Sequence, residues 1–310
     1  MNPAFSVIAL TVLSGAAQGL VVLLALSVLA HGRVESAFAS RSLGLALVLM
    51  VAALASSFFH LGRPERAWRA AAMWRTSWLS REVIALPTFA VAIAVWWWGI
   101  AAGLPPALTQ VAGPLVCMAL AALLWVCTAR IYACLRFVQE WAQPLTLVNF
   151  VLTGLASGFA LGAALLAASG ENRAVVVAPM AIALLLAAGL ARGAAIARNR
   201  GLRHRSTLQS ATGIAAPSLR QMSMGMSAGS FNTREFFHRA TAGTVRRIRW
   251  VALGLGFALP ALVGGVAVAS GEPRLWWLAV AVQACGLVAD RWLFFAEAKH
   301  PQNLYYQVVS

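Results

Sequence analysis

One segment of the sequence places titratable, basic and flexible residues close together. It begins at His60, continues through Gly62, Arg63 and Arg66, and ends at Glu82. An imidazole and a carboxylate can both exchange protons near neutral pH, and a guanidinium donates hydrogen bonds to a carbonyl or an anion. The segment therefore carries the groups needed for proton exchange with a ligand that has two carbonyl oxygens, such as a quinone.

A second set of polar residues lies inside or at the ends of long apolar runs. It comprises Gln18, Arg130, Tyr132, Asp290 and Arg291. Ionisable groups surrounded by apolar sequence are costly and are usually paired or functional. We expect either an intramembrane charge network or a structural pair of Asp290 with Arg291 or with Arg130. Gln18 must find a hydrogen-bond partner on another helix.

The elements that position these residues are membrane-spanning helices. The chain has 310 residues, of which 61% are hydrophobic and 11% charged, and its mean hydropathy of +0.77 excludes a water-soluble core. A helix needs roughly 20 apolar residues to cross a bilayer. We predict an all-α membrane protein, a bundle of eight transmembrane helices forming a single integral membrane domain over residues 1-310. The expected spans are 5-31, 42-60, 80-103, 108-134, 147-169, 174-197, 249-270 and 275-296.

Orientation follows from the distribution of basic residues. Twenty of the 24 arginines and lysines fall on the side that carries both termini, and four fall on the other side. Cytoplasmic loops are enriched in basic residues, so both termini and the long 198-249 loop are expected in the cytoplasm. The net charge of +15 is thus a topology signal. The basic side can also bind lipid head groups or an acidic subunit. No nucleic acid is expected as a partner.

His60 and Glu82 end neighbouring spans on this basic side. They are 22 positions apart, and spans two and three leave the membrane on the same side, so the two groups can approach each other at the interface. The alternative is that His60 caps a helix and Glu82 pairs with Arg81 or Arg66. In that case Trp68, Trp74 and Trp78 are interfacial residues without a chemical role.

The five histidines do not favour haem in this chain. A b-type haem needs facing axial ligands inside the membrane, and here His31 and His60 end spans on opposite sides. The other three, His204, His238 and His300, lie in loops or beyond the last span. No CxxC pair or cysteine and histidine cluster predicts a metal site.

Several motifs resemble one family of membrane anchors. The order His60-Leu61-Gly62-x-Pro64-x-Arg66-Ala67, then Leu79-Ser80-x-Glu82, then Arg130-Ile131-Tyr132 is similar to the DmsC-type anchor subunits of dimethyl sulfoxide reductases. The segments from Ser230 to His238 and from Asp290 to Tyr306 more closely resemble the SoeC-type branch, which anchors cytoplasmic sulfite dehydrogenases. The resemblance covers essentially the whole chain.

The resemblance implies an eight-helix anchor of the bacterial inner membrane without haem. Its expected partners are a four-cluster iron-sulfur subunit and a molybdopterin catalytic subunit on the cytoplasmic side. Its cofactor is ubiquinone or menaquinone, and the family's quinone-site residues correspond to His60, Glu82 and Arg66. The family's last span has a Gly-Glu pair, whereas Gly286 is followed here by Leu287.

Four functions are consistent with this pattern. Because the quinone-site residues lie on the basic side, electrons from cytoplasmic sulfite oxidation to sulfate would reach quinone there. The alternatives are a quinol-oxidising anchor of a dimethyl sulfoxide reductase type complex and an ion-translocating subunit that uses Arg130, Asp290 and Arg291. A purely structural anchor without quinone is a further possibility.

Overall fold

A computed structural model describes residues 1-2, 4-32, 35-59, 61-169, 174-223, 236-238 and 240-305. Within these ranges the chain forms helices, turns and irregular segments, and no strand. Eight helices in the described residues are long and apolar enough to cross a membrane, as predicted. They are α1 (Phe5–His31), α2 (Ser36–Phe58), α3 (Trp78–Ala101), η2 with α4 (Ala107–Ala112 and Gly113–Ala133), α5 (Pro144–Ser169), α6 (Ala174–Arg200), α9 with η3 and α10 (Ala242–Leu253, Gly254–Ala258 and Leu259–Ser270), and α11 (Leu275–Ala296).

Some helices extend several residues beyond the apolar runs that predicted them. Span seven begins at Ala242, where the Thr241 hydroxyl accepts a hydrogen bond from the Thr244 amide at 3.2 Å. A threonine cap satisfies amide groups that a helix start leaves without partners, so the helix can begin in polar sequence. The basic turn that contains Arg246 and Arg247 therefore belongs to the helix.

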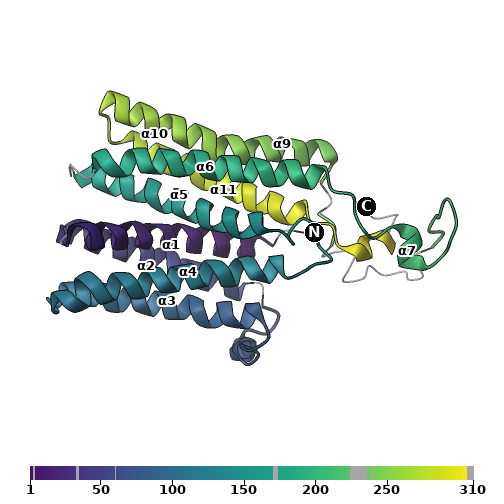
Figure 1. The fold of residues 1–310 in the computed structure, drawn as a ribbon, viewed down its shortest axis with the longest axis horizontal. Helices are drawn as coiled ribbons and strands as arrows, with labels where there is room; N and C mark the ends of the chain where they lie inside the picture. Colours follow the sequence, from purple (N-terminus) through teal and green to yellow (C-terminus); the bar gives the residue numbers. More distant parts are fainter. Residues whose placement is uncertain are drawn as a thin grey trace.

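Two helices, α1 and α5, form the centre of the bundle. Each is buried along most of its length, and they pack against each other and against helices on both sides. Figure 1 shows α3 and α4 on one side of this central pair, and α6 and α10 on the other. Apolar side chains such as Val91, Val95 and Leu190 are exposed on the outer surface, as lipid contact requires.

Glycines allow α1 and α5 to approach each other closely. A Cβ atom added to Gly158 would lie 2.0 Å from the carbonyl carbon of Gly19, and one added to Gly19 would lie 1.9 Å from the carbonyl oxygen of Gly154. Any larger side chain would therefore push the two backbones apart. Small residues spaced four apart are a common means of packing helices within a membrane.

The π-helical turn η3 provides a second close contact, with α11. A Cβ atom on Gly286 would lie 2.0 Å from the amide nitrogen of Gly256. The widened turn moves the backbone of span seven toward α11, and π-helical turns of this kind are rare within α-helices. The contact fixes α11 just before its buried Asp290 and Arg291.

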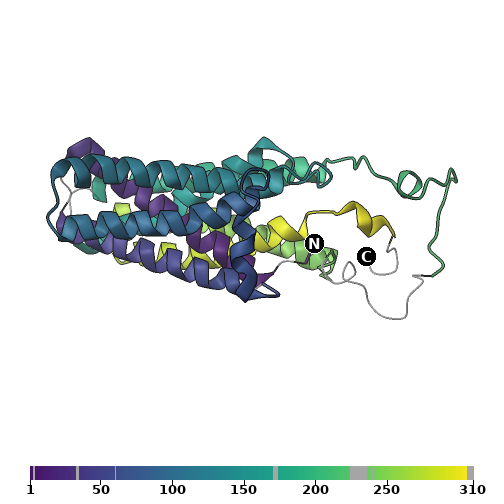
Figure 2. The same cartoon turned by 90° about the horizontal axis from the view of Figure 1, so that it is seen from below.

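Both ends of the described chain lie at the same end of the bundle. The Met1 amine donates hydrogen bonds to the carbonyl oxygens of Phe295 and Ala298, at 3.2 and 3.1 Å. The segments 61-77, 134-143 and 201-241, as far as they are described, lie at this end as well, and we call it the arginine-rich end. Figure 2 shows α7 (Leu208–Thr212) and η4 (Pro301–Tyr305) projecting beyond the helices there.

Candidate functional site

Glu82 lies in the second turn of α3, near the arginine-rich end, and is buried. Its carboxylate accepts a hydrogen bond from the Thr128 hydroxyl on the neighbouring helix α4. The Ser77 hydroxyl caps the start of α3 by accepting from the Ser80 amide at 3.3 Å, which fixes the helix just before Glu82. A buried carboxyl is thus held by a neutral hydroxyl from another helix.

The ion pairs considered for Glu82 do not form. Arg81 instead donates to the carbonyl oxygens of Trp74 and Arg75, at 2.9 and 2.8 Å, and its guanidinium lies 4.2 Å from the Trp78 ring centre. These contacts fold the preceding segment back onto the start of α3. Neighbours in sequence point to different faces of a helix, so Arg81 cannot follow Glu82 into the interior.

The other predicted members of this site are more exposed. Arg66 lies in the 3-10 helix η1 (Pro64–Ala71) with its guanidinium 3.9 Å from the Glu65 carboxylate. Gly62 and Arg63 are exposed, with no neighbouring atoms within 4 Å of a Cβ built on Gly62. His60 lies outside the described residues. The structure therefore places Glu82 in the interior and Gly62, Arg63 and Arg66 on the surface at the same end.

Large apolar side chains are exposed around this segment. They include Phe59, which is 86% exposed, at the end of α2, and Trp68 and Trp74 in the segment that leads to α3. Indole rings favour the boundary between lipid and water. The arginine-rich end of α2 and α3 thus presents exposed apolar side chains.

Asp290 forms an ion pair that differs from both expected ones. Its carboxylate bonds to the Arg192 guanidinium on α6, and both side chains are almost completely buried. The expected partners, Arg291 and Arg130, are elsewhere. Arg130 is exposed, 5.9 Å from the Trp78 ring centre. The prediction was wrong because nothing in an apolar run shows how each helix is rotated about its axis.

Arg291 points into the bundle next to an aromatic cluster. Its guanidinium carbon lies 4.1 Å from the centre of the Phe150 ring on α5, a cation–π contact. Tyr132 stacks on the same ring with centroids 5.9 Å apart, and also contacts Trp141 and Phe294. Tyr132 and Arg291 thus share one aromatic cluster, and Arg130 is not part of it.

Gln18 has the partner on another helix that its position requires. Its side-chain amide donates to the carbonyl oxygen of Ala121 on α4, at 3.0 Å, and the residue is 2% exposed. This bond joins the central helix α1 to the helix that carries Thr128. Gln18 also lines a small interior cavity together with Thr128 and Arg291.

Comparison with known proteins agrees with this architecture. Residues 1–224 match the family described as the DMSO reductase anchor subunit (DmsC). The chain belongs to this anchor subunit family. The protein is also 47% identical to the C subunit of sulfite dehydrogenase from Allochromatium vinosum, over the full length of both chains.

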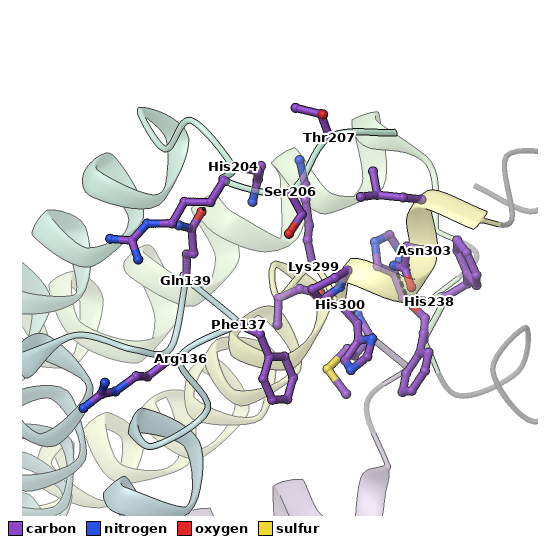
Figure 3. Close-up of a pocket in the computed structure, with 18 of the residues that line it drawn as sticks. Arg136, Phe137, Gln139, His204, Ser206, Thr207, His238, Lys299, His300 and Asn303 are labelled. Carbon is purple, nitrogen blue, oxygen red and sulfur yellow. Dashed lines mark hydrogen bonds between the residues drawn. The ribbon is translucent and has the colours of Figure 1, made fainter. Parts of the chain in front are cut away.

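The arginine-rich end of this anchor protein has an open pocket of about 770 Å³. Figure 3 shows His204, His238 and His300 around it, together with Lys299 and Arg136. Its walls come from Met1 and from four further segments, after α4, after α6, before α9 and at the end of α11 and beyond it. No aspartate or glutamate lines the pocket, among the residues that the structure describes.

Aromatic contacts and hydrogen bonds organise this pocket. The His300 ring stacks on Phe236 with centroids 4.2 Å apart, and the Asn303 amide donates to the Phe236 carbonyl oxygen at 3.1 Å. His204 lies on another wall, 3.6 Å from the Glu140 carboxylate. The segment before α9 is thus held against the segment after α11.

Burial weakens the charge of three groups that line the pocket. It lowers the pKa of the Met1 amine to about 6, although the nearby Glu140 carboxylate opposes the shift. It also lowers the pKa values of His238 and His300, and the adjacent Met1 amine lowers them further. The other basic side chains in the lining are Arg136, His204, Arg205 and Lys299.

Sequence reasoning missed Thr128, Arg192 and this pocket. A threonine or a single arginine in an apolar run does not reveal its partner. The sequence did contain an indication of the pocket, because His238 and His300 lie in the two segments that resemble sulfite dehydrogenase anchors. The fold brings these two segments together.

Proposed function

We propose that this anchor subunit binds quinone beside Glu82 and passes to it the electrons of sulfite oxidation by partner subunits. The observation that carries the proposal is the environment of Glu82. Its carboxyl is buried in a membrane-spanning helix, is bonded to the Thr128 hydroxyl, and has no bonded cation in the described part of the chain. Such a group can take up and release a proton without breaking an ion pair.

The residues around Glu82 fit a quinone. When bound, a quinone takes up two electrons and two protons on reduction to quinol. Glu82 would hold and exchange a proton at its carboxyl group, and Arg66 and His60 would donate hydrogen bonds from the neighbouring segment. Phe59, Trp68 and Trp74 supply exposed apolar surface for the isoprenoid tail.

The arginine-rich end is proposed to face the cytoplasm of a bacterial inner membrane. This orientation rests on the bias of arginine and lysine between the two sides. The iron-sulfur subunit would dock on this end, where the pocket around Arg136, Arg205 and Lys299 provides positive charge for acidic side chains. The molybdopterin subunit would bind to the iron-sulfur subunit.

Sulfite is proposed as the electron source because of the full-length similarity to the protein from Allochromatium vinosum. A cytoplasmic docking face agrees with a catalytic subunit that oxidises sulfite in the cytoplasm. In a dimethyl sulfoxide reductase type complex the anchor would instead oxidise quinol. Both directions would use the same carboxyl, so substrate assays must separate them.

The test is sulfite-dependent quinone reduction by the complex purified with its native partner subunits. We expect activity in the wild type and in Glu272→Gln, a control in an exposed connection at the opposite end. Glu82→Gln and His60→Ala should lose most quinone reduction while sulfite still reduces a soluble dye. Full quinone reduction by Glu82→Gln would overturn the site. Quinol-driven reduction of dimethyl sulfoxide without any sulfite activity would overturn the sulfite assignment alone.

A further inference from the structure

A small polar cavity lies inside the bundle between α1, α4, α5 and α11. Its volume is about 10 Å³, close to the space that one water molecule needs. It is lined on several sides by hydroxyl groups, although the surrounding helices are strongly apolar. The polar residues in its lining are Thr11, Ser14, Gln18, Thr128, Thr153, Ser157 and Arg291.

Two hydrogen-bond donors in the cavity wall lack acceptors. The indole nitrogen of Trp125 is buried and has no hydrogen-bond partner. The Arg291 guanidinium is buried and lies over the Phe150 ring, a contact that satisfies none of its N–H donors. An unsatisfied polar group is especially costly within a membrane, where bulk water cannot reach it. The cavity therefore needs an occupant that accepts hydrogen bonds.

Water is the occupant that fits both the volume and the chemistry. A water oxygen can accept from an indole and a guanidinium, and its two hydrogens can be donated to hydroxyl oxygens such as those of Ser14 and Thr153. A larger anion does not fit into about 10 Å³. The cavity has at least three polar groups in its wall, as a buried water requires.

We propose that one water molecule occupies this cavity and accepts hydrogen bonds from Trp125 and Arg291, and that this water allows Thr128 to act as a positioning residue for Glu82. Thr128 belongs to both sites, because it lines the cavity and donates to the Glu82 carboxylate. The inference rests on the proposed function only for the role of Glu82.

The water solves a problem that proton exchange at Glu82 creates. When Glu82 is ionised, the Thr128 hydroxyl donates its hydrogen to the carboxylate. When Glu82 is protonated, its new hydrogen can be donated to the Thr128 oxygen, and the Thr128 hydrogen must turn to another acceptor. Trp125 and Arg291 offer only donors, whereas the water oxygen can accept two hydrogen bonds. In this state it accepts from Trp125 and from the Thr128 hydroxyl, and Arg291 keeps its cation–π contact with Phe150. Both protonation states of Glu82 then remain fully hydrogen-bonded.

The first test is the structure of the whole complex, determined by electron cryo-microscopy at a resolution that shows ordered water at other buried sites. The expected result is density for one water within hydrogen-bond distance of the Trp125 indole nitrogen and of Arg291. A cavity without density, in a map with other buried waters, would overturn the proposal. This readout does not depend on activity.

The second test compares Thr128→Val, which keeps the shape of the side chain, with Thr128→Ser, which keeps the hydroxyl. Thr128→Val should lower quinone reduction about tenfold and alter its pH dependence, because the Glu82 carboxyl loses its hydroxyl partner. Thr128→Ser should retain the wild-type profile. Equal behaviour of Val and Ser would overturn the role of the hydroxyl.

Two further variants separate this inference from the proposed function. Trp125→Phe should remove the water density, whereas Trp96→Phe should not, because Trp96 bonds to the Thr109 carbonyl oxygen at the other end of the bundle. If Glu82→Gln abolishes quinone reduction while Thr128→Val is unaffected, this inference fails and the quinone site stands. If Glu82→Gln is fully active, the quinone site itself fails.

Discussion

The two buried carboxyl groups in the membrane-spanning helices have opposite environments. Asp290, on α11, is neutralised by the Arg192 guanidinium from α6. Among the described residues, Glu82 on α3 is hydrogen-bonded only to the Thr128 hydroxyl from α4. Both lie in the half of the bundle nearer the arginine-rich end, and both are less than one-tenth exposed. Two carboxyl groups at similar positions along the bundle thus differ in their partner, which is a guanidinium for Asp290 and a hydroxyl for Glu82.

This difference is the basis for proposing a structural role for Asp290 and proton exchange for Glu82. A carboxylate paired with arginine inside a membrane joins two helices and must break that pair to change its protonation state. A carboxyl bonded to a hydroxyl can exist in either state with little rearrangement. The ion-translocation alternative, which relied on Asp290, is therefore less well supported than proton exchange at Glu82.

The largest effect on stability is expected from Asp290→Asn. This change leaves the buried Arg192 without its anion, and breaking a buried pair costs about 3–5 kcal/mol. The unfolding transition of the purified complex in detergent, or the yield of assembled complex, would measure the loss. The double variant Arg192→Met with Asp290→Leu should recover most of it. Wild-type stability of Asp290→Asn would contradict the comparison.

Glu82→Gln should lower activity strongly and change stability little, the reverse of the effect expected for Asp290→Asn. We expect a loss of roughly 100-fold in quinone reduction, about 2.7 kcal/mol in the barrier, because the amide cannot exchange a proton. The free energy of unfolding should change by less than about 1 kcal/mol, since no ion pair is broken. Steady-state rates and thermal unfolding of the same sample would decide. A destabilisation as large as that of Asp290→Asn would remove the distinction between the two sites.

Gly158→Ala should destabilise the surroundings of both Glu82 and Asp290, because the crossing of α1 and α5 lies between these two carboxyl groups. The added methyl would meet the Gly19 backbone and should cost about 1–3 kcal/mol as overpacking. The matched control is Gly193→Ala on α6, where a Cβ meets no atom within 4 Å. Removing a helix glycine there should be neutral or stabilising by up to about 1 kcal/mol. Equal unfolding temperatures for the two variants would refute the close packing.

The smallest effect concerns pH and involves groups outside the membrane-spanning helices. The Met1 amine has a pKa lowered from 8.0 to about 6 by burial, so folding disfavours its charged form. The docking of Met1 on Phe295 and Ala298 should therefore strengthen as pH rises from about 6 to 8, by about 1 kcal/mol for a partly buried group. Burial also lowers the pKa values of His238 and His300. These two histidines should therefore also favour the docked state more as the pH rises toward the pKa of an unfolded histidine.

Hydrogen exchange of residues 296-305 at pH 8 and at pH 5.5 would measure this effect. We expect weaker protection at the lower pH, after correction for the intrinsic exchange rate, while α1 and α5 remain unchanged. Uniform protection at both values, or stronger protection at pH 5.5, would show that these groups do not hold the pocket together.

The sequence was sufficient to predict the eight spans because apolar length alone identifies them. It also indicated Glu82, since a carboxylate at a span end after a histidine and arginine segment is unusual. It did not identify Thr128 or Arg192 as partners. Helices that are apolar on every face carry no stripe that shows their rotation, so pairs such as Arg192 and Asp290, from separate helices, emerge only from packing.

The most direct test of the central claim is redox difference infrared spectroscopy of the quinone-loaded complex, with soluble mediators carrying the electrons. The account predicts that a carboxyl C=O band changes when the bound quinone is reduced, that Glu272→Gln keeps this band, and that Glu82→Gln loses it. The bands of the quinone itself would show that reduction occurred in each sample. An unchanged carboxyl band in Glu82→Gln would contradict the assignment of Glu82 as the proton-exchanging group.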